Sequence, residues 1–236
     1  MPVAAELVVA FENELRTAVR LLEYGLAALQ EIDAANDFYQ LPLLLLASGS
    51  ERLCKCTLLL SSERTAGAFP TQGELRKWGH DVRSLTEAVR HECFTTDYLR
   101  IPAAAEDEAF LRSDAVLQGI LACLSDFGSG GRYYELDVIS GASPGGPSPD
   151  VAWMNLEMTI VKADSSLTAM LQDPSALGRI YDEIRPRLQM ALERYLRALC
   201  RLFTLGPISK EGKRFSGAVG AFLFLRDDQL GVRRYA

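Results

Sequence analysis

The chain has 236 residues, of which 48% are hydrophobic and 24% are charged. This composition is ordinary for a globular protein and excludes wholesale disorder. The longest apolar stretch, Leu41 to Ala47, is far shorter than the roughly 20 residues that cross a bilayer, so we expect neither a membrane-spanning segment nor a membrane partner.

The first residues lack the basic start and apolar block of a signal peptide, which favours a cytoplasmic protein. The five cysteines are odd in number and scattered along the chain, and we expect them to be reduced and packed as small hydrophobic groups. Cys54 and Cys56 resemble a metal-binding pair, but two residues along a helix point in opposite directions, and no histidine is near in the sequence. We therefore expect no metal and no cofactor.

The net charge of −6 is unevenly distributed. Residues 1–173 carry 13 basic and 25 acidic side chains, a net charge of −12, whereas residues 174–236 carry 12 basic and 6 acidic side chains, a net charge of +6. A basic C-terminal region leaves contact with nucleic acid open, although the whole chain is acidic.

Apolar residues recur at helical spacing along most of the chain, beginning with Val8, Phe11, Leu15 and Ala18. No segment has the pattern of a β-sheet, so we predict an all-α fold, a bundle of about seven to eight helices. The second helix is apolar on all sides in its first half, which favours a central, fully buried helix. The predicted helices span residues 4–34, 41–62, 74–78, 82–95, 104–127, 151–171, 175–204 and 212–225.

Residues 1–130 are expected to form one helical bundle, and residues 131–236 a C-terminal extension that packs on it. Trp153, Leu156 and Tyr195 need apolar surface to cover them. We therefore expect the two parts to form one continuous fold.

The longest predicted loop, residues 128–150, is rich in glycine and proline, and a loop of this length is typically functional or a linker. It contains Arg132 and Tyr133, a cation beside an aromatic ring, a combination that binds single-stranded nucleic acid in other proteins. The alternative is that the tyrosines pack the loop onto the helices while Arg132 pairs with an acidic residue.

A basic stripe is predicted on the helix of residues 175–204. It has two interpretations: contact with phosphates, or neutralisation of the acidic helices of the same chain. Its members are Arg187, Arg194, Arg197 and Arg201.

Two segments carry a family resemblance. Ser48 to Lys55 contains Ser-Glu-Arg-Leu-Cys-Lys, and Trp78 to Leu85 begins Trp-Gly-His-Asp-Val. Together, separated by a loop, they resemble the second and third helices of HEPN-domain proteins. The resemblance covers about residues 1–130.

This resemblance implies a helical bundle, often a homodimer, from a bacterial toxin–antitoxin, defence or stress system. Many members are metal-independent ribonucleases in which an arginine and a histidine at a short, fixed spacing act on RNA. Here three residues separate Arg76 from His80 and seven separate Arg83 from His91, so neither pair has the family spacing. Members without that motif bind RNA or partner proteins without cleaving them.

Among the candidate catalytic residues, His80 and His91 are the side chains that titrate near neutral pH, and Arg83 lies on the same helix side as His91. The alternative is that His80 caps a helix and that Arg83 belongs to a solvated ion-pair face. Glu51, Lys55 and Asp81 are expected to have structural roles, with Glu51 bonding Lys55 or the Gly-His-Asp turn.

Two functions remain open from the sequence. The first is a HEPN-like protein that binds or cleaves RNA. The second is a non-catalytic helical interaction protein that docks a protein partner or a second copy, with a homodimer expected.

Overall fold

The computed structural model describes residues 5–33, 35–143, 145–173 and 176–236. These residues contain twelve α-helices and no β-strand, which confirms the all-α prediction, although the predicted helix count was too low. The α-helices are α1 (Ala5–Gln30), α2 (Gln40–Ala66), α3 (Gln72–Lys77), α4 (Val82–Cys93), α5 (Pro102–Ser113), α6 (Ala115–Ser129), α7 (Tyr134–Ile139), α8 (Pro149–Lys162), α9 (Ser165–Met170), α10 (Leu177–Arg201), α11 (Lys210–Lys213) and α12 (Gly220–Leu223). Short 3-10 helices are η1 (Tyr98–Arg100), η2 (Gly131–Tyr133), η4 (Arg214–Gly217) and η5 (Asp227–Gln229).

Two of the four additional helices arise where an aspartate starts a new helix inside an apolar pattern, and a third arises because the predicted helix 212–225 is divided into α11 and α12. Asp114 has an extended backbone, and its carboxylate accepts the Leu117 N–H at 2.9 Å, so the predicted helix 104–127 is two helices, α5 and α6. Asp164 does the same at the start of α9 and divides the predicted helix 151–171. The predicted loop 128–150 also contains helical structure, η2 and α7.

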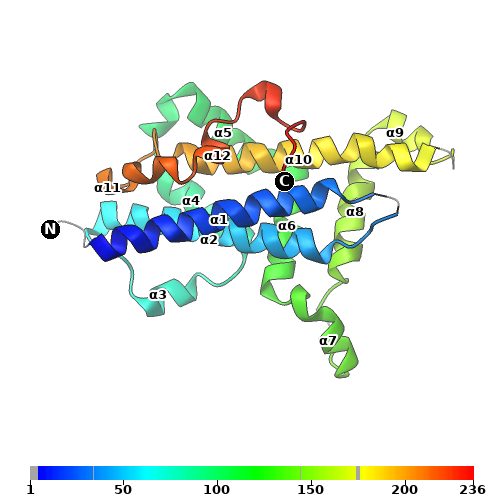
Figure 1. The fold of residues 1–236 in the computed structure, drawn as a ribbon, viewed down its shortest axis with the longest axis horizontal. Helices are drawn as coiled ribbons and strands as arrows, with labels where there is room; N and C mark the ends of the chain where they lie inside the picture. The colour runs from blue at the N-terminus through cyan, green and yellow to red at the C-terminus, as the bar shows by residue number, and fades with distance from the viewer. Residues whose placement is uncertain (1–4, 34, 144, 174–175) are drawn as a thin grey trace.

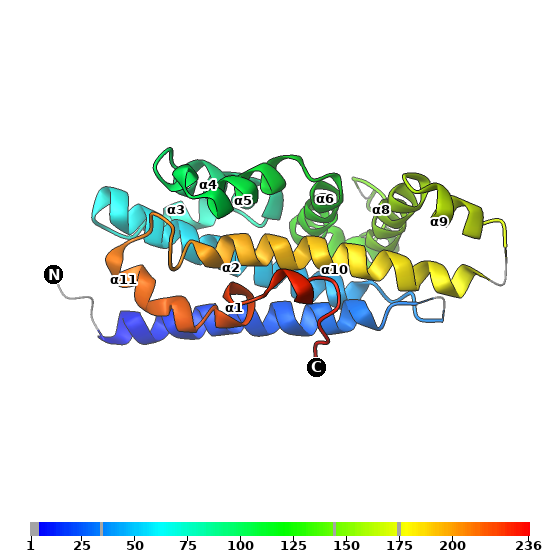
Figure 2. The ribbon, with the colours of Figure 1, turned by 90° about the horizontal axis from the view of Figure 1, so that it is seen from above.

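Three long helices, α1, α2 and α10, run along the long axis of the molecule (Figure 1). Helices α1 and α2 form an antiparallel hairpin, and α4 and α6 also pack on α2. Viewed from above, α4, α5, α6, α8 and α9 form a layer on one side of the long helices, opposite α1 (Figure 2). Helix α10 contacts α1 and α2 as well as α5, α6, α8 and α9 of this layer, and it also contacts α12.

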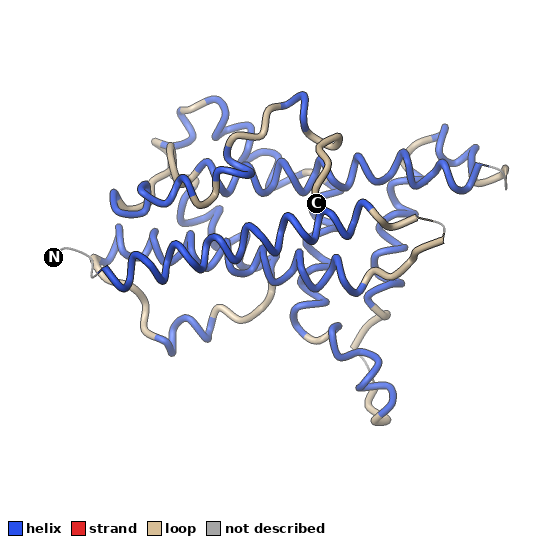
Figure 3. Tube along the Cα trace, in the orientation of Figure 1, coloured by secondary structure: helices blue, strands red, loops and turns tan. Residues whose placement is uncertain are grey.

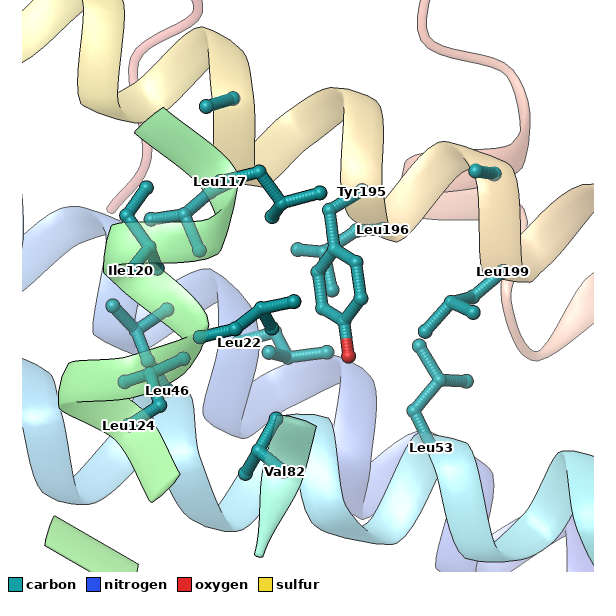
Figure 4. Packing of buried hydrophobic residues seen from close by; sticks show 14 of the residues in the cluster. Leu22, Leu46, Leu53, Val82, Leu117, Ile120, Leu124, Tyr195, Leu196 and Leu199 are labelled. Carbon is teal, nitrogen blue, oxygen red and sulfur yellow. The ribbon is translucent and has the colours of Figure 1, made fainter. Parts of the chain in front are cut away.

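One cluster of buried apolar side chains extends from α1 to the C-terminal residues. It contains residues from both parts of the chain that the sequence analysis distinguished, including Leu15, Leu53, Trp153 and Phe222. Figure 4 shows the Tyr195 ring reaching from α10 into this cluster, near Leu22 of α1 and Leu53 of α2. The two parts therefore share one core.

Helices α1 and α2 approach closely because glycines face leucines across their contact. A Cβ at Gly25 would lie 2.8 Å from Leu46 Cγ, and a Cβ at Gly49 would lie 2.7 Å from Leu22 Cγ. Each leucine packs against the glycine of the other helix, where a larger side chain would not fit, and this packing allows the two helices to lie close together.

The first turns of α2 differ from the expected fully buried helix. Leu43 and Leu46 are 1% and 0% exposed, whereas Leu41 and Leu44 are 48% and 44% exposed. The prediction was wrong for this side of α2, because no neighbouring helix covers it in the described part of the chain. None of the described helices is long and apolar enough to cross a membrane.

Candidate functional site

His80 lies in the short connection between α3 and α4. Gly79 takes a left-handed backbone conformation (φ 65°) after α3, and Asp81 caps α4 by accepting the Ser84 N–H at 3.0 Å. These two local signals hold His80 at the surface, with its side chain 54% exposed.

The His80 ring contacts a carboxylate. Its Nδ1 lies 3.0 Å from Oε1 and 3.1 Å from Oε2 of Glu51, and Lys55 Nζ donates to the same Glu51 at 2.7 Å. Burial opposes ionisation of Glu51, but the hydrogen bonds and charges of Lys55 and His80 outweigh it and lower the pKa of this carboxyl. Both contacts considered for Glu51 are thus present, and they tie α2 to the turn before α4.

The other candidate catalytic residues lie apart from this cluster. The Arg83 side chain is exposed, and its backbone N–H donates to Ser125 Oγ of α6 at 2.8 Å. His91 is 84% exposed, with Nδ1 3.3 Å from Glu92 Oε1. Within the described residues, no hydrogen bond or ion pair joins either histidine to an arginine, so the structure shows no assembled Arg–His site.

The arginines of the predicted basic stripe point toward acidic or aromatic side chains of the same molecule. Arg201 donates to both oxygens of Asp107 on α5 at 2.8 Å, and Arg187 donates to Asp164 at 2.7 Å. The Arg194 guanidinium carbon lies 4.0 Å from the centre of the Phe110 ring.

Arg197 is the most buried arginine of the stripe, with its side chain only 8% exposed. It donates to Asp227 Oδ1 at 2.8 Å and to the Leu225 carbonyl at 3.1 Å. Three of the four arginines therefore pair with carboxylates of the chain, the arrangement that the second interpretation expects, whereas Arg194 contacts an aromatic ring.

The segment that contains Arg132 and Tyr133 projects from the body of the molecule. We define the arm as residues 130–143, which include η2 and α7. In Figure 1 and Figure 3, α7 extends away from the long helices. The left-handed Gly141 (φ 80°) follows α7, and no residue of η2 or α7 is fully buried.

Apolar side chains of the arm are exposed to solvent. Tyr133, Leu136 and Ile139 are 52%, 63% and 80% exposed, and a spacing of three residues places them on one side of a helical segment. Arg132 stacks on Tyr133, with 5.0 Å between its guanidinium carbon and the ring centre. The exposed Tyr133 does not attach the loop to the helices, so it does not fit the packing alternative. Binding of nucleic acid by Arg132 and Tyr133 stays a prediction.

The arm borders the exposed start of α2. A hollow of about 460 Å³ lies between them, lined by Phe38, Leu41, Leu44, Phe127 and the Arg132–Tyr133 pair together with Gln40. We call the exposed apolar residues of the arm and of the α2 start the docking surface: Phe38, Leu41, Leu44, Tyr133, Leu136, Val138 and Ile139.

Carboxylates adjoin the docking surface in the sequence, where Asp37 precedes Phe38 and Glu135 precedes Leu136. Burial, and after it the charges of Glu135 and Asp37, raise the pKa of Asp150. A second hollow, of about 470 Å³ on the other side of Phe127, includes Asp126 and Asp137 in its wall. Among the described residues, Arg132 is the one cation that lines the first hollow, and the lining of the second hollow contains no lysine or arginine.

The docking surface was largely missed from the sequence. Arg132 and Tyr133 were recognised as a cation beside an aromatic ring, but Leu136 and Ile139 were not singled out. The signal was present, because three large aliphatic residues, Leu136, Val138 and Ile139, stand in a segment otherwise rich in glycine and proline.

Cysteine chemistry gives no alternative site. The cysteines are buried and free, and burial raises the pKa of the Cys54 and Cys93 thiols to about 11. Protonated thiols of this kind are poor nucleophiles at neutral pH. Among the described residues, no group of three or more His, Cys, Asp or Glu side chains has an arrangement that holds a metal ion.

Comparison of the chain with protein-family models, with curated proteins and with solved structures finds no significant match.

The Asp107–Arg201 ion pair is expected to contribute to the free energy of unfolding. Burial raises the pKa of Asp107, and Arg201 offsets only part of this rise. Replacing Arg201 with alanine removes the hydrogen-bonded counter-ion of this carboxylate and leaves only the charges of Arg197 and Arg194 to act on it. This change is expected to lower the free energy of unfolding by about 3 kcal/mol, measured by urea denaturation.

The exposed Arg83→Ala is the matched control and should change stability by no more than about 0.5 kcal/mol. The double variant Asp107→Leu/Arg201→Met should recover most of the loss, because it removes both charges. An Arg201→Ala protein as stable as the wild type would contradict the assignment of this arginine to the interior.

Proposed function

We propose that this chain is a non-catalytic helical interaction protein that binds a protein partner through the docking surface. The observation that carries the proposal is the exposure of Tyr133, Leu136 and Ile139 on a projecting arm. Exposed apolar groups that lie together mark sites of protein interaction, whereas single exposed hydrophobic residues need no explanation.

The charges around the surface indicate the charge that a partner should carry. Asp37 and Glu135 adjoin Phe38 and Leu136 of the surface in the sequence, and one guanidinium, that of Arg132, lines its hollow. A complementary partner presents apolar side chains flanked by lysine or arginine. A second copy joined through the same surface would oppose these carboxylates to each other, so a different protein fits the surface better than a homodimer does.

The hollow beside the arm suits a helical segment. Its walls come from α2 on one side and from Tyr133 on the other, with Phe127 also lining it. An amphipathic helix that places apolar residues at i, i+3, i+4 and i+7 in such a hollow would cover Leu41 and Leu44.

A displayed library of helical peptides tests this proposal with the intact protein as bait. Selected peptides are expected to combine an apolar face with net positive charge, and their affinity, measured by fluorescence anisotropy, should fall as salt increases. The Leu136→Asp/Ile139→Asp variant should weaken binding at least about tenfold, because it removes two apolar contacts and adds like charges to the acidic surroundings.

Phe224→Asp is the matched control, because Phe224 is 73% exposed outside the docking surface. It should leave the peptide affinity unchanged. Both variants should keep the melting temperature of the wild type, since all three side chains are exposed. The proposal is contradicted if the arm variant binds the selected peptides as tightly as the Phe224→Asp protein does, or if the arm variant dissociates a stable homodimer.

One contact supports RNA cleavage, the function that the HEPN resemblance implies, as a second candidate. The His80 imidazole is half-exposed and bonded to Glu51, and a general base needs a group that orients it in this way. An arginine that would bind the phosphate is missing from the hydrogen-bond and ion-pair partners of His80 in the described part of the chain.

The second candidate predicts that the purified protein cleaves RNA at low salt, that His80→Ala abolishes cleavage, and that His91→Ala does not. Gel analysis of labelled single-stranded RNA measures the cleavage, and binding is followed at low and moderate salt. If neither cleavage nor salt-sensitive binding is observed, this candidate is excluded and the docking surface remains.

A further inference from the structure

A mostly apolar cavity of about 290 Å³ lies between α8 and α10, next to the end of α9. Aliphatic side chains such as Met158, Val161 and Ile184 form most of its wall, and Glu157 and Tyr181 are its polar members. It is separate from the docking surface, since no residue of that surface lines it.

Glu157 is an unusual residue for such a wall because it is 6% exposed. Its Oε2 accepts a hydrogen bond from the Tyr39 hydroxyl at 2.9 Å, and its Oε1 accepts one from Trp153 Nε1 at 3.1 Å. Both donors are neutral, and no lysine or arginine of the described residues pairs with this carboxylate.

Burial raises the pKa of Glu157, and the hydrogen bonds of Tyr39 and Trp153 offset only part of the rise. A buried carboxylate without a counter-ion is costly, because neutral donors replace only part of its hydration. Two other buried carboxylates provide the comparison: Asp107 has Arg201 as its counter-ion, and Glu193 accepts three hydrogen bonds from neutral donors. Glu157 has neither a counter-ion nor a third donor, and it lines a cavity from which a ligand can supply the positive group.

The carboxylate retains acceptor capacity. Two oxygens offer about four acceptor positions, and hydrogen bonds from Tyr39 and Trp153 occupy two of them. An ammonium group has three donors and a positive charge, and so complements what remains.

We infer that this cavity binds a small hydrophobic cation, an alkylammonium-type ligand whose charged group is held by Glu157 and whose chain lies against the aliphatic wall. A neutral ligand would leave the carboxylate uncompensated, and an anion would be repelled by it. The volume is at the small end for ligand pockets, so a short chain fits. The Met154 and Met158 side chains adapt to its shape, as methionines do at binding surfaces.

Three probes of equal chain length test the inference by isothermal titration calorimetry at neutral pH: hexylammonium, hexan-1-ol and hexanoate. Hexylammonium is expected to bind at one site, at least about tenfold more tightly than hexan-1-ol, because a charge-assisted hydrogen bond adds to the same apolar contact. Hexanoate should not bind. Fluorescence of Trp153 in a Trp78→Phe background should report the same site, because Trp153 donates to Glu157.

Glu157→Gln removes the charge while its amide oxygen still accepts from Trp153 and its amide NH2 donates to the Tyr39 hydroxyl. This variant should lose the preference for hexylammonium and keep the affinity for hexan-1-ol. Met158→Phe, which reduces the cavity, should weaken both, and circular dichroism verifies that each variant is folded. The inference is overturned if hexan-1-ol binds the wild type as tightly as hexylammonium, if Glu157→Gln retains the preference, or if no probe binds saturably.

Discussion

The fold depends on partners for the charged side chains that α10 carries into or beside the interior of the bundle. This helix supplies Leu188, Leu192, Tyr195 and Leu199 to the core, and all four are completely buried. Glu193 and Arg197 lie between them and are 0% and 7% exposed, while Arg187 and Arg201 are partly buried. An unpaired charge in such a place would be costly.

Each of these charges reaches a partner on a different element. Arg201 binds α5, Arg187 binds the start of α9, and Arg197 binds the C-terminal residues. Glu193, which is 0% exposed, accepts the Gly231 N–H at 2.6 Å and the Tyr235 hydroxyl at 2.7 Å. Together these bonds fasten α5, α9 and the last residues of the chain to one helix, and they give a structural reason for the opposite net charges of the two parts of the sequence.

The periodicity of the sequence predicts the long helices well, because each buries one apolar stripe. The i, i+4 spacing also predicts the contact of Glu51 with Lys55, which is local. The contact of Glu51 with His80 joins positions 29 apart and was one of two alternatives, and the structure contains both. The partners of the α10 arginines were not predictable in the same way. Asp107 and Arg201 are 94 positions apart, and only the packing of α5 on α10 brings them together.

Local capping signals also determine where the helices begin. An aspartate that caps a helix inside a continuous apolar pattern divides it, as Asp114 and Asp164 do, and the sequence contained both. The exposure of Leu41 and Leu44 has a different origin. The first turns of α2 are apolar on all sides, and this pattern predicts burial. These two leucines are exposed because the surrounding helices leave one side of α2 uncovered.

Three arginines of α10 pair with carboxylates of the molecule, whereas the arm and the start of α2 expose apolar side chains without cover. Hydrogen exchange followed by mass spectrometry tests this difference between α10 and the arm most directly. Amides of residues 188–203 should exchange only through global unfolding, while those of residues 131–140 should exchange through local opening at every protein concentration. An arm as protected as α10, or one whose protection rises with protein concentration, would contradict the account, because the docking surface would then be covered by the chain itself or by a second copy.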